Sequence, residues 1–198
     1  MIQIFDISIE KPYEVFTRYY DKALEAEQRN IEAISISSFN KEKNEVESRY
    51  VNLKYILKDE WIFFSNYKSR KATDFKSHDQ ISVLFYWSNI DTQIRMKAKI
   101  KKASSDISDN HFLKRDIKKN ALAVSSYQSK QIDSYADVIK NYELSFKNIK
   151  NEPRPSFWGG YSFTPYYFEF WEGHKSRINK RISYRFDDED WNKKILQP

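Results

Sequence analysis

The sequence predicts an α+β fold that is mainly β, an antiparallel barrel with flanking helices. Two observations predict it. Five successive segments between residues 31 and 101 have the polar–apolar alternation, or the aromatic and β-branched content, that is typical of strands. Helix-like segments stand before and after them, and two more strand-like segments follow. This order of helix, five strands, two helices and two strands favours an antiparallel barrel.

The chain has 198 residues, so we expect one domain over residues 1–198. Hydrophobic residues make up 40% and charged residues 31%, which is enough apolar material for a core. The absence of cysteine excludes disulfides, thiolate metal sites and cysteine nucleophiles. Only three glycines occur, and the single adjacent pair is Gly159-Gly160, which excludes the clustered glycines of P-loop and Rossmann phosphate sites.

No segment predicts a membrane helix. The longest strongly apolar run is Ile81–Trp87, which has the length of a strand. The first residues lack the basic segment and apolar stretch of a secretory signal. We therefore expect a soluble cytoplasmic protein.

A helix is predicted over Pro12–Arg29, because proline suits a first helical turn and apolar residues then recur on one face. The strands predicted next are Ile31–Phe39, Arg49–Leu57, Trp61–Ser65, Ile81–Trp87 and Gln93–Lys101. The charged segment Lys41–Glu47 is predicted to form the turn between the first two strands. Apolar and polar residues alternate most strictly in the strand that begins at Gln93, so we expect one of its faces to be buried and the other to be exposed to solvent.

Helices are predicted over Asp109–Ser126 and, with clearer spacing, Gln131–Lys150. Strands resume at Tyr161–Trp171 and Arg177–Phe186. The expected layout is an N-terminal helix at 12–29, a barrel at 31–101, helices at 109–150 and C-terminal strands at 161–186.

The formal net charge of +6 favours an anionic partner. Three basic sets fall at predicted strand ends: Arg49 with Lys54, Ser69-Arg70-Lys71, and Arg177 with Arg181. At Ser69, a predicted helix start, hydroxyl, guanidinium and backbone N–H groups can converge on a phosphate. Arg177 and Arg181 are four residues apart on one predicted strand, so we expect them to share a face. Any one set alone is better explained as surface charge, but three sets in one barrel favour an anion site.

Other partners are less favoured. The histidines His78, His111 and His174 are isolated, and no carboxylate–histidine spacing repeats, so no metal site is expected. No RNP-type, helix-turn-helix or zinc motif accompanies the basic charge, which makes nucleic acid an unlikely partner.

Nine stretches carry a family resemblance over nearly the whole chain from Pro12. They are SRYVNLK (48–54), FFSNYKSRKA (63–72), LFYW (84–87), the strand that begins at Gln93, YQS (127–129), PRPSFWGGY (153–161), EFW (169–171), RINKR (177–181) and ILQP (195–198). In this order the chain resembles the pyridoxamine/pyridoxine 5′-phosphate oxidase family of FMN enzymes. The resemblance implies an FMN-binding split β-barrel and a homodimer, with one FMN in each of two sites at the subunit interface.

The resemblance also implies which residues bind the flavin and its phosphate. They are Arg49, Tyr50, Val51, Asn52, Leu53, Lys54, Phe64, Ser65, Arg70, Lys71, Gln93, Gln128, Ser129, Trp171 and Arg181. Phe64 and Ser65 stand where the family usually has Tyr and Thr. Several cations and hydroxyls would thus hold a phosphate without glycines, as the composition requires.

The implied substrate-binding residues match the family less well. They are Lys54, His111, Arg115, Lys119, Arg177 and Asn179, of which Arg177 and Asn179 stand at the catalytic positions. His111 replaces a usual Tyr, Lys119 a Ser and Asn179 a His. Asn179 cannot act as a cationic or acid–base group, so the residues leave more than one substrate open.

The implied reaction is hydride transfer from pyridoxamine or pyridoxine 5′-phosphate to FMN, followed by reoxidation by dioxygen, giving pyridoxal 5′-phosphate and hydrogen peroxide. Two alternatives stay open. One is an FMN-dependent oxidoreductase of the same fold that acts on another anionic or aromatic substrate, as in secondary metabolism. The other is a flavin-binding protein without turnover.

Overall fold

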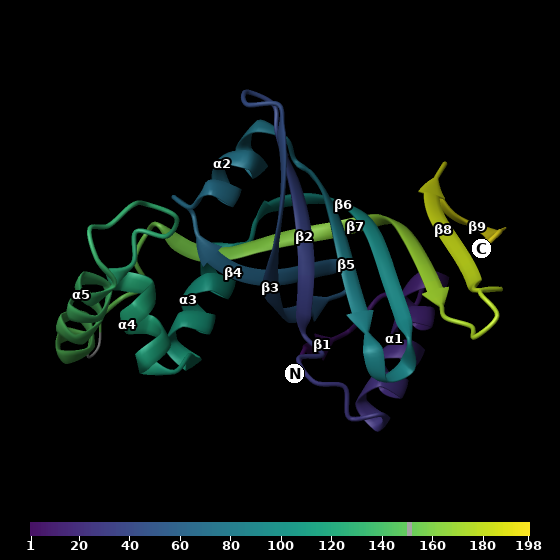
Figure 1. Ribbon diagram of the computed structural model, residues 1–198, viewed down its shortest axis with the longest axis horizontal. Coiled ribbons are helices and arrows are strands. Elements are labelled where there is room, and N and C mark those ends of the chain that lie inside the picture. Colours follow the sequence, from purple (N-terminus) through teal and green to yellow (C-terminus); the bar gives the residue numbers. More distant parts are fainter. Residues whose placement is uncertain (150–151) are drawn as a thin grey trace.

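A computed structural model describes residues 1–149 and 152–198. Within these residues nine strands form one sheet: β1 (Gln3–Phe5), β2 (Ala33–Asn40), β3 (Glu45–Leu57), β4 (Glu60–Asn66), β5 (Gln80–Trp87), β6 (Thr92–Lys102), β7 (Trp158–Glu172), β8 (Lys180–Asp187) and β9 (Asp190–Leu196). The α-helices are α1 (Lys11–Glu25), α2 (Arg70–Ser77), α3 (Ser105–Lys114), α4 (Ile117–Ser125) and α5 (Tyr135–Asn148) (Figure 1).

Six of these strands close into a ring, because β4 pairs with both β3 and β7 while β2, β5 and β6 connect β3 to β7 on the other side. The predicted α+β, mainly β class with a split-barrel arrangement is confirmed. The sheet is not wholly antiparallel, since the short strand β1 runs parallel to β3. Strands β8 and β9 extend the sheet beyond the ring from β7.

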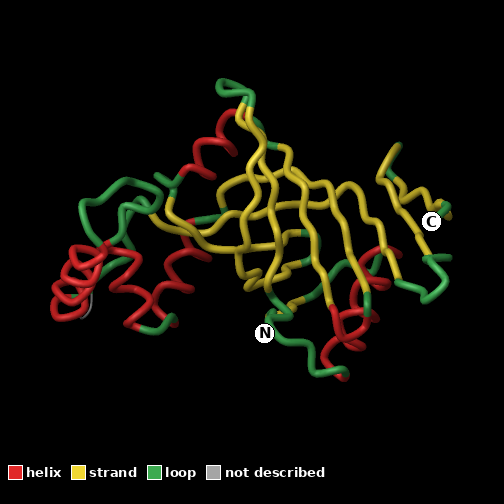
Figure 2. The backbone as a smooth tube through the Cα atoms, viewed as in Figure 1, coloured by secondary structure: helices red, strands yellow, loops and turns green. Residues whose placement is uncertain are grey.

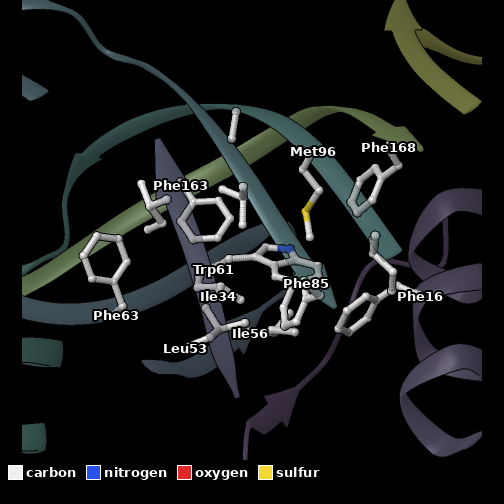
Figure 3. Close-up of a cluster of buried hydrophobic side chains, with 14 of the residues drawn as sticks. Phe16, Ile34, Leu53, Ile56, Trp61, Phe63, Phe85, Met96, Phe163 and Phe168 are labelled. Atoms are coloured by element: carbon white, nitrogen blue, oxygen red, sulfur yellow. The ribbon is translucent and has the colours of Figure 1, made fainter. Parts of the chain in front are cut away.

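Large aromatic and aliphatic side chains fill the inside of the ring (Figure 3). Trp61, Phe85 and Phe163 are fully buried there. Helix α1 packs onto this core through Phe16, whose ring centroid lies 4.5 Å from that of Trp61 in an edge contact. The alternation predicted for β6 is confirmed, because Ile94, Met96, Ala98 and Ile100 are buried and their neighbours are not.

Several predicted boundaries are wrong. Helix α1 ends at Glu25 rather than Arg29, because Glu27 adopts a left-handed φ of 52° and the chain turns back on Ala23 through the Gln28 N–H at 2.9 Å. The predicted turn Lys41–Glu47 is shorter, since β3 already begins at Glu45.

The helix predicted over Asp109–Ser126 is two helices. Arg115 is extended, and the Asp116 side chain accepts a hydrogen bond from the Lys118 N–H at 2.7 Å, which caps a new helix. Helix α5 likewise begins after a serine cap at Ser134 rather than at Gln131. Its predicted end at Lys150 lies outside the described residues.

The strand predicted to begin at Arg177 begins at Lys180 instead. Arg177 lies in the preceding turn, where its φ is 64°. The prediction that Arg177 and Arg181 share one strand face is therefore wrong. The final strand β9 was not predicted, because the β8–β9 turn uses left-handed Asp188 and Glu189 rather than the glycine or asparagine that usually signals a hairpin.

The helices gather at particular ends of the sheet (Figure 2). Helices α3, α4 and α5 lie together at one end, with α2 on the same side, and the β8–β9 hairpin lies at the other end (Figure 1). Over the residues that the structure describes, no helix combines the length and apolar character needed to cross a membrane.

Candidate functional site

A buried lysine organises the first part of the site. Lys71, in the first turn of α2, donates from Nζ to Ser65 Oγ at 3.1 Å, to Ser69 Oγ at 3.3 Å and to Gln128 Oε1 at 3.1 Å. These partners come from the end of β4, the start of α2 and the segment after α4. The structure thus brings Gln128 to Ser65 and Lys71, from which it is more than 50 residues away in the sequence.

Burial and the nearby charge of Arg49 lower the pKa of Lys71 to about 8, although Asp74 opposes the shift. The hydrogen-bond partners of the ammonium group are neutral oxygens. A buried cation with neutral partners is strongly stabilised by an anion, because a charge-assisted hydrogen bond then replaces a neutral one.

A cavity of about 230 Å³ adjoins this cluster. Three predicted residues line it, namely Arg70, Gln128 and Ser129. The other lining residues are Asn40, Lys43, Lys68, Thr73 and Lys130. Cations, hydroxyls and amides such as these fit a phosphate group well. We call Ser65, Arg70, Lys71, Gln128 and Ser129 the α2 group.

Arg49 reaches this region from β3. Its guanidinium donates to Ser38 Oγ at 2.6 Å and pairs with Asp74 at 3.4 Å and Glu47 at 3.2 Å. Asp74 is buried and also accepts from Asn40 at 3.0 Å, so it fixes β2, β3 and α2 to one another.

The rest of the predicted segment from Arg49 to Lys54 is divided between the two faces of β3. Tyr50 and Asn52 are exposed, and Tyr50 pairs with Ser35 on the outer face of the sheet. Leu53 is fully buried in the core, so its side chain is not available to a ligand. Lys54 lies at a bulge and pairs with Glu32 at 3.6 Å.

Aromatic rings form a second pocket next to the α2 group. Phe64 stacks on His111 with ring centroids 3.7 Å apart and on Trp158 at 5.5 Å. The Arg115 guanidinium lies over the Trp158 ring at 4.9 Å. The resulting pocket of about 200 Å³ is lined by Phe64, Ser65, Asn66, Arg115, Lys119, Leu122, Ala123, Ser126, Gln128 and Trp158. Because Ser65 and Gln128 also belong to the α2 group, the two sites are continuous.

The glycine pair allows this packing. A Cβ on Gly160 would lie 2.8 Å from Ala103 Cβ, and one on Gly159 would meet the Tyr67 hydroxyl. The Gly160 N–H donates to Ser108 Oγ of α3 at 3.0 Å. The glycines therefore allow α3 to approach β7 closely. This approach holds Trp158, at the start of β7, beside Phe64.

His111 is neutral at physiological pH. Burial, with the charges of Arg115 and Lys54, lowers its pKa to about 4. Its Nδ1 is hydrogen-bonded to the Tyr55 hydroxyl at 2.7 Å. His111 therefore contributes a neutral ring rather than a positive charge to the predicted substrate side.

The remaining cofactor residues form a row across three strands. Gln93 of β6 pairs with Trp171 of β7, which pairs with Arg181 of β8. Paired residues of an antiparallel sheet share a face, so the three side chains lie side by side on the outer face. We call Gln93, Trp171 and Arg181 the β8 group.

Glu169 holds Arg181 in this row. Its Oε1 accepts from Arg181 Nε at 3.0 Å and Nη2 at 2.8 Å, and Arg95 and Tyr167 also donate to the carboxylate. Burial raises the pKa of Glu169, but the hydrogen bonds from Arg181 and Tyr167 outweigh it and hold the pKa below its usual value. Glu169 is thus a charged anchor for Arg181.

The predicted catalytic residues lie in the exposed turn between β7 and β8. The Arg177 N–H donates to the His174 carbonyl at 2.8 Å. Asn179 Oδ1 accepts from the His174 N–H at 3.0 Å, so its amide oxygen already stabilises the turn.

One chain does not unite the whole predicted site. Helices α2, α3 and α4, which carry Lys71, His111 and Lys119, lie toward the helical end (Figure 1). Strand β8, which carries Arg181, and the turn before it, which holds Arg177, lie toward the β8–β9 end. The sequence indicated Ser69 beside Lys71, but it did not indicate Asp74 and Glu169 as anchors or Trp158 as a pocket wall. No local spacing indicates Asp74, because its partners Ser38, Asn40 and Arg49 are 25 to 36 residues away in the sequence.

Comparison with known families gives two matches. The family model described as "Pyridoxamine 5'-phosphate oxidase" matches residues 20–142. The model described as "Pyridoxine 5'-phosphate oxidase C-terminal dimerisation region" matches residues 158–198. Between them they include the α2 group, the aromatic pocket and the β8 group.

Curated relatives agree with these matches. The pyridoxine/pyridoxamine 5'-phosphate oxidase of Neisseria meningitidis serogroup C is 32% identical over 190 residues, which cover 96% of this chain and 90% of the relative. The enzyme of the same name from Cytophaga hutchinsonii is 36% identical over 185 residues, covering 91% and 86%.

Solved structures show that the fold is shared. PhzG from Burkholderia lata, in complex with tetrahydrophenazine-1-carboxylic acid, has a TM-score of 0.90 at 23% identity and covers 96% of this chain and 93% of its own. A pyridoxamine 5'-phosphate oxidase-related, FMN binding protein from Nostoc punctiforme has a TM-score of 0.76 at 12% identity, with coverage of 96% and 99%.

Proposed function

This chain belongs to the pyridoxamine 5′-phosphate oxidase family, and on that premise we propose that it oxidises pyridoxine and pyridoxamine 5′-phosphates to pyridoxal 5′-phosphate. It is an oxidoreductase with FMN as cofactor, and dioxygen is the proposed final acceptor. One observation carries the proposal: the aromatic pocket with Arg115 and Lys119 is continuous with the cationic α2 group. An aromatic phosphate ester and a flavin phosphate would thus be held side by side.

The α2 group is the proposed holder of the FMN phosphate. Lys71 supplies a buried ammonium group, Arg70 a guanidinium at the cavity wall, and Ser65, Gln128 and Ser129 supply neutral polar groups. The side chains of Lys71 and Ser65 are already ordered by hydrogen bonds to Gln128, so little conformational entropy remains to be lost on binding.

The active form is proposed to be a homodimer with one FMN site at each of two equivalent positions between subunits. The match of residues 158–198 to a dimerisation region supports association. Further support comes from the separation of the α2 group and the β8 group within one chain, because a two-fold partner could bring its β8 group to this chain's α2 group.

On the substrate side, Arg115 and Lys119 are proposed to bind the substrate phosphate, and Phe64 and Trp158 to pack against its ring. Arg177, from the other end of the chain, would orient the reacting carbon. When bound, FMN supplies the acceptor for the hydride that leaves this carbon. The protein's contribution is position: a substrate held at near-attack distance loses much of the entropic barrier.

Oxygen consumption and peroxide release by FMN-loaded protein test this function. With pyridoxine or pyridoxamine 5′-phosphate we expect one peroxide per pyridoxal 5′-phosphate formed, and no turnover with unphosphorylated pyridoxine at the same concentration. Absence of turnover with both phosphates, in protein that binds FMN, would refute the proposed substrate.

A second candidate is oxidation of another anionic or aromatic substrate at the same site. Two observations favour it: His111 is neutral and engaged with Tyr55, and Asn179 is engaged in its turn. Both depart from the residue types usual in the family. Flavin reduction by other aromatic anions, but not by pyridoxine 5′-phosphate, would support this candidate. If none of these compounds reduces the flavin, the protein would be a flavin-binding protein without turnover.

The lowered pKa of Lys71 predicts how FMN affinity depends on pH. A bound phosphate dianion stabilises the charged lysine and raises its pKa above 8. FMN affinity should therefore be nearly constant from pH 7 to 8 and fall as the pH rises beyond 8, where the unliganded lysine loses its proton. Titrations followed by flavin fluorescence measure this, and riboflavin, which has no phosphate, should lack the decrease.

A further inference from the structure

Arg70 of the α2 group and Arg49, which reaches the same region from β3, share a carboxylate. Glu47 lies two residues before Arg49 on β3, so both side chains point to the α2 side of the strand. Its Oε2 lies 3.2 Å from Arg49 Nη2, and its Oε1 pairs with Arg70 Nη2. Within residues 1–149 and 152–198, it is the one carboxylate that pairs with both guanidinium groups.

The other acidic partners differ from Glu47 in what they do. Asp74 is buried and fixes Arg49 to β2, which makes it part of the framework. Glu45 pairs with Arg70 at 2.9 Å, and both side chains are half exposed. Glu47 is more enclosed, with 30% of its side chain exposed, and it bridges the two cations.

A carboxylate in this position opposes a phosphate in two ways. It uses guanidinium donors that a phosphate would take, and its negative charge repels a second anion in the same place. Lys71 is close enough to Arg49 for the arginine to lower its pKa, so the bridge adjoins the α2 group.

We propose that Glu47 is an internal competitor for the cofactor phosphate, which limits the affinity of this protein for FMN. The inference rests on the proposed placement of FMN at the α2 group. It assigns to Glu47 a role in setting how readily the cofactor is exchanged, and no role in the chemical step.

The test measures FMN and riboflavin affinities of purified protein by flavin fluorescence quenching. Glu47→Gln keeps the shape of the side chain and removes its charge. It should tighten FMN binding by about fivefold, the effect of removing one partly screened charge contact, and leave riboflavin binding unchanged. Glu47→Ser, measured alongside, should show the same gain, and thermal melting identifies any variant that fails to fold.

Glu42→Gln is the matched control, because Glu42 lies in the exposed β2–β3 turn and its loss changes the net charge equally. It should change FMN affinity by much less than Glu47→Gln. Unchanged or weaker FMN binding in both Glu47 variants would overturn the inference, as would an equal gain for riboflavin. A wild-type protein that binds no FMN would instead refute the proposed site itself.

Discussion

Replacing Lys71 with methionine is expected to weaken FMN binding by roughly 10–100-fold, the range for losing a charge-assisted hydrogen bond to a phosphate. The Nζ of Lys71 is the point where Ser65, Ser69 and Gln128 converge. Equilibrium titration with FMN measures the loss. Riboflavin affinity should change little, because riboflavin has no phosphate, and Lys71→Arg should recover part of the FMN affinity.

The same variant should not lose stability. The folded-state pKa of Lys71 is about 8, below its ordinary 10.5, so burying the charged form costs free energy at neutral pH. That cost disappears as the pH rises from 8 toward 10.5. Lys71→Met without FMN should therefore melt at least as high as the wild type at pH 7. A lower melting temperature would show that Lys71 serves the fold rather than the ligand.

Replacing Arg177 with alanine is expected to lower kcat/KM for pyridoxine 5′-phosphate by about 10–100-fold while FMN stays bound. Arg177 lies in an exposed turn apart from the α2 group, and Arg181 is held by Glu169, so the cofactor contacts should persist. Steady-state oxygen consumption measures the first effect and flavin absorbance of the purified protein the second. Loss of FMN from the variant would contradict this division of roles.

Asn179→His tests whether the pocket is that of the usual oxidase. A histidine restores an acid–base group and should raise activity on pyridoxine 5′-phosphate by roughly 10-fold or more. If that activity stays undetectable in Asn179→His and Arg177→Ala changes nothing, the site serves another substrate.

The sequence was sufficient to predict the barrel because its strands carry strong local signals. The alternation from Gln93 to Lys101 identified β6 and its buried face. Breaks inside helices were harder to predict, because the capping side chain of Asp116 is one residue within a helical composition. The predicted strand start at Arg177 was wrong for a similar reason, because nothing in the residue pattern indicates that an arginine adopts a left-handed conformation.

For the site, the family resemblance assigned Lys71, Ser65 and Gln128 to one cofactor site, and the fold brings these three side chains together. The anchors Asp74 and Glu169 could not be predicted, because their roles depend on contacts across strands and between α2 and β2. The bridging role of Glu47 likewise depends on the tertiary structure, since it requires Arg70 of α2 to face β3. The sequence therefore indicated the proposed ligand-binding groups better than the groups that hold them in place.

The central claim is that each FMN site combines the α2 group of one subunit with the β8 group of the other. Lys71→Met damages the first group, and Arg181→Gln damages the second while keeping a donor for Glu169. Each variant alone should bind FMN more weakly than the wild type by about tenfold or more. The two variants are then unfolded, mixed in equal amounts and refolded together, with dimers verified by sedimentation.

Half of the resulting dimers are hybrids, and each hybrid has one site with both groups intact. The account predicts recovery of tight FMN binding in about a quarter of all sites. If both groups belonged to one site within the same chain, every hybrid site would carry one damaged group. No recovery of tight binding in verified hybrid dimers would contradict the account.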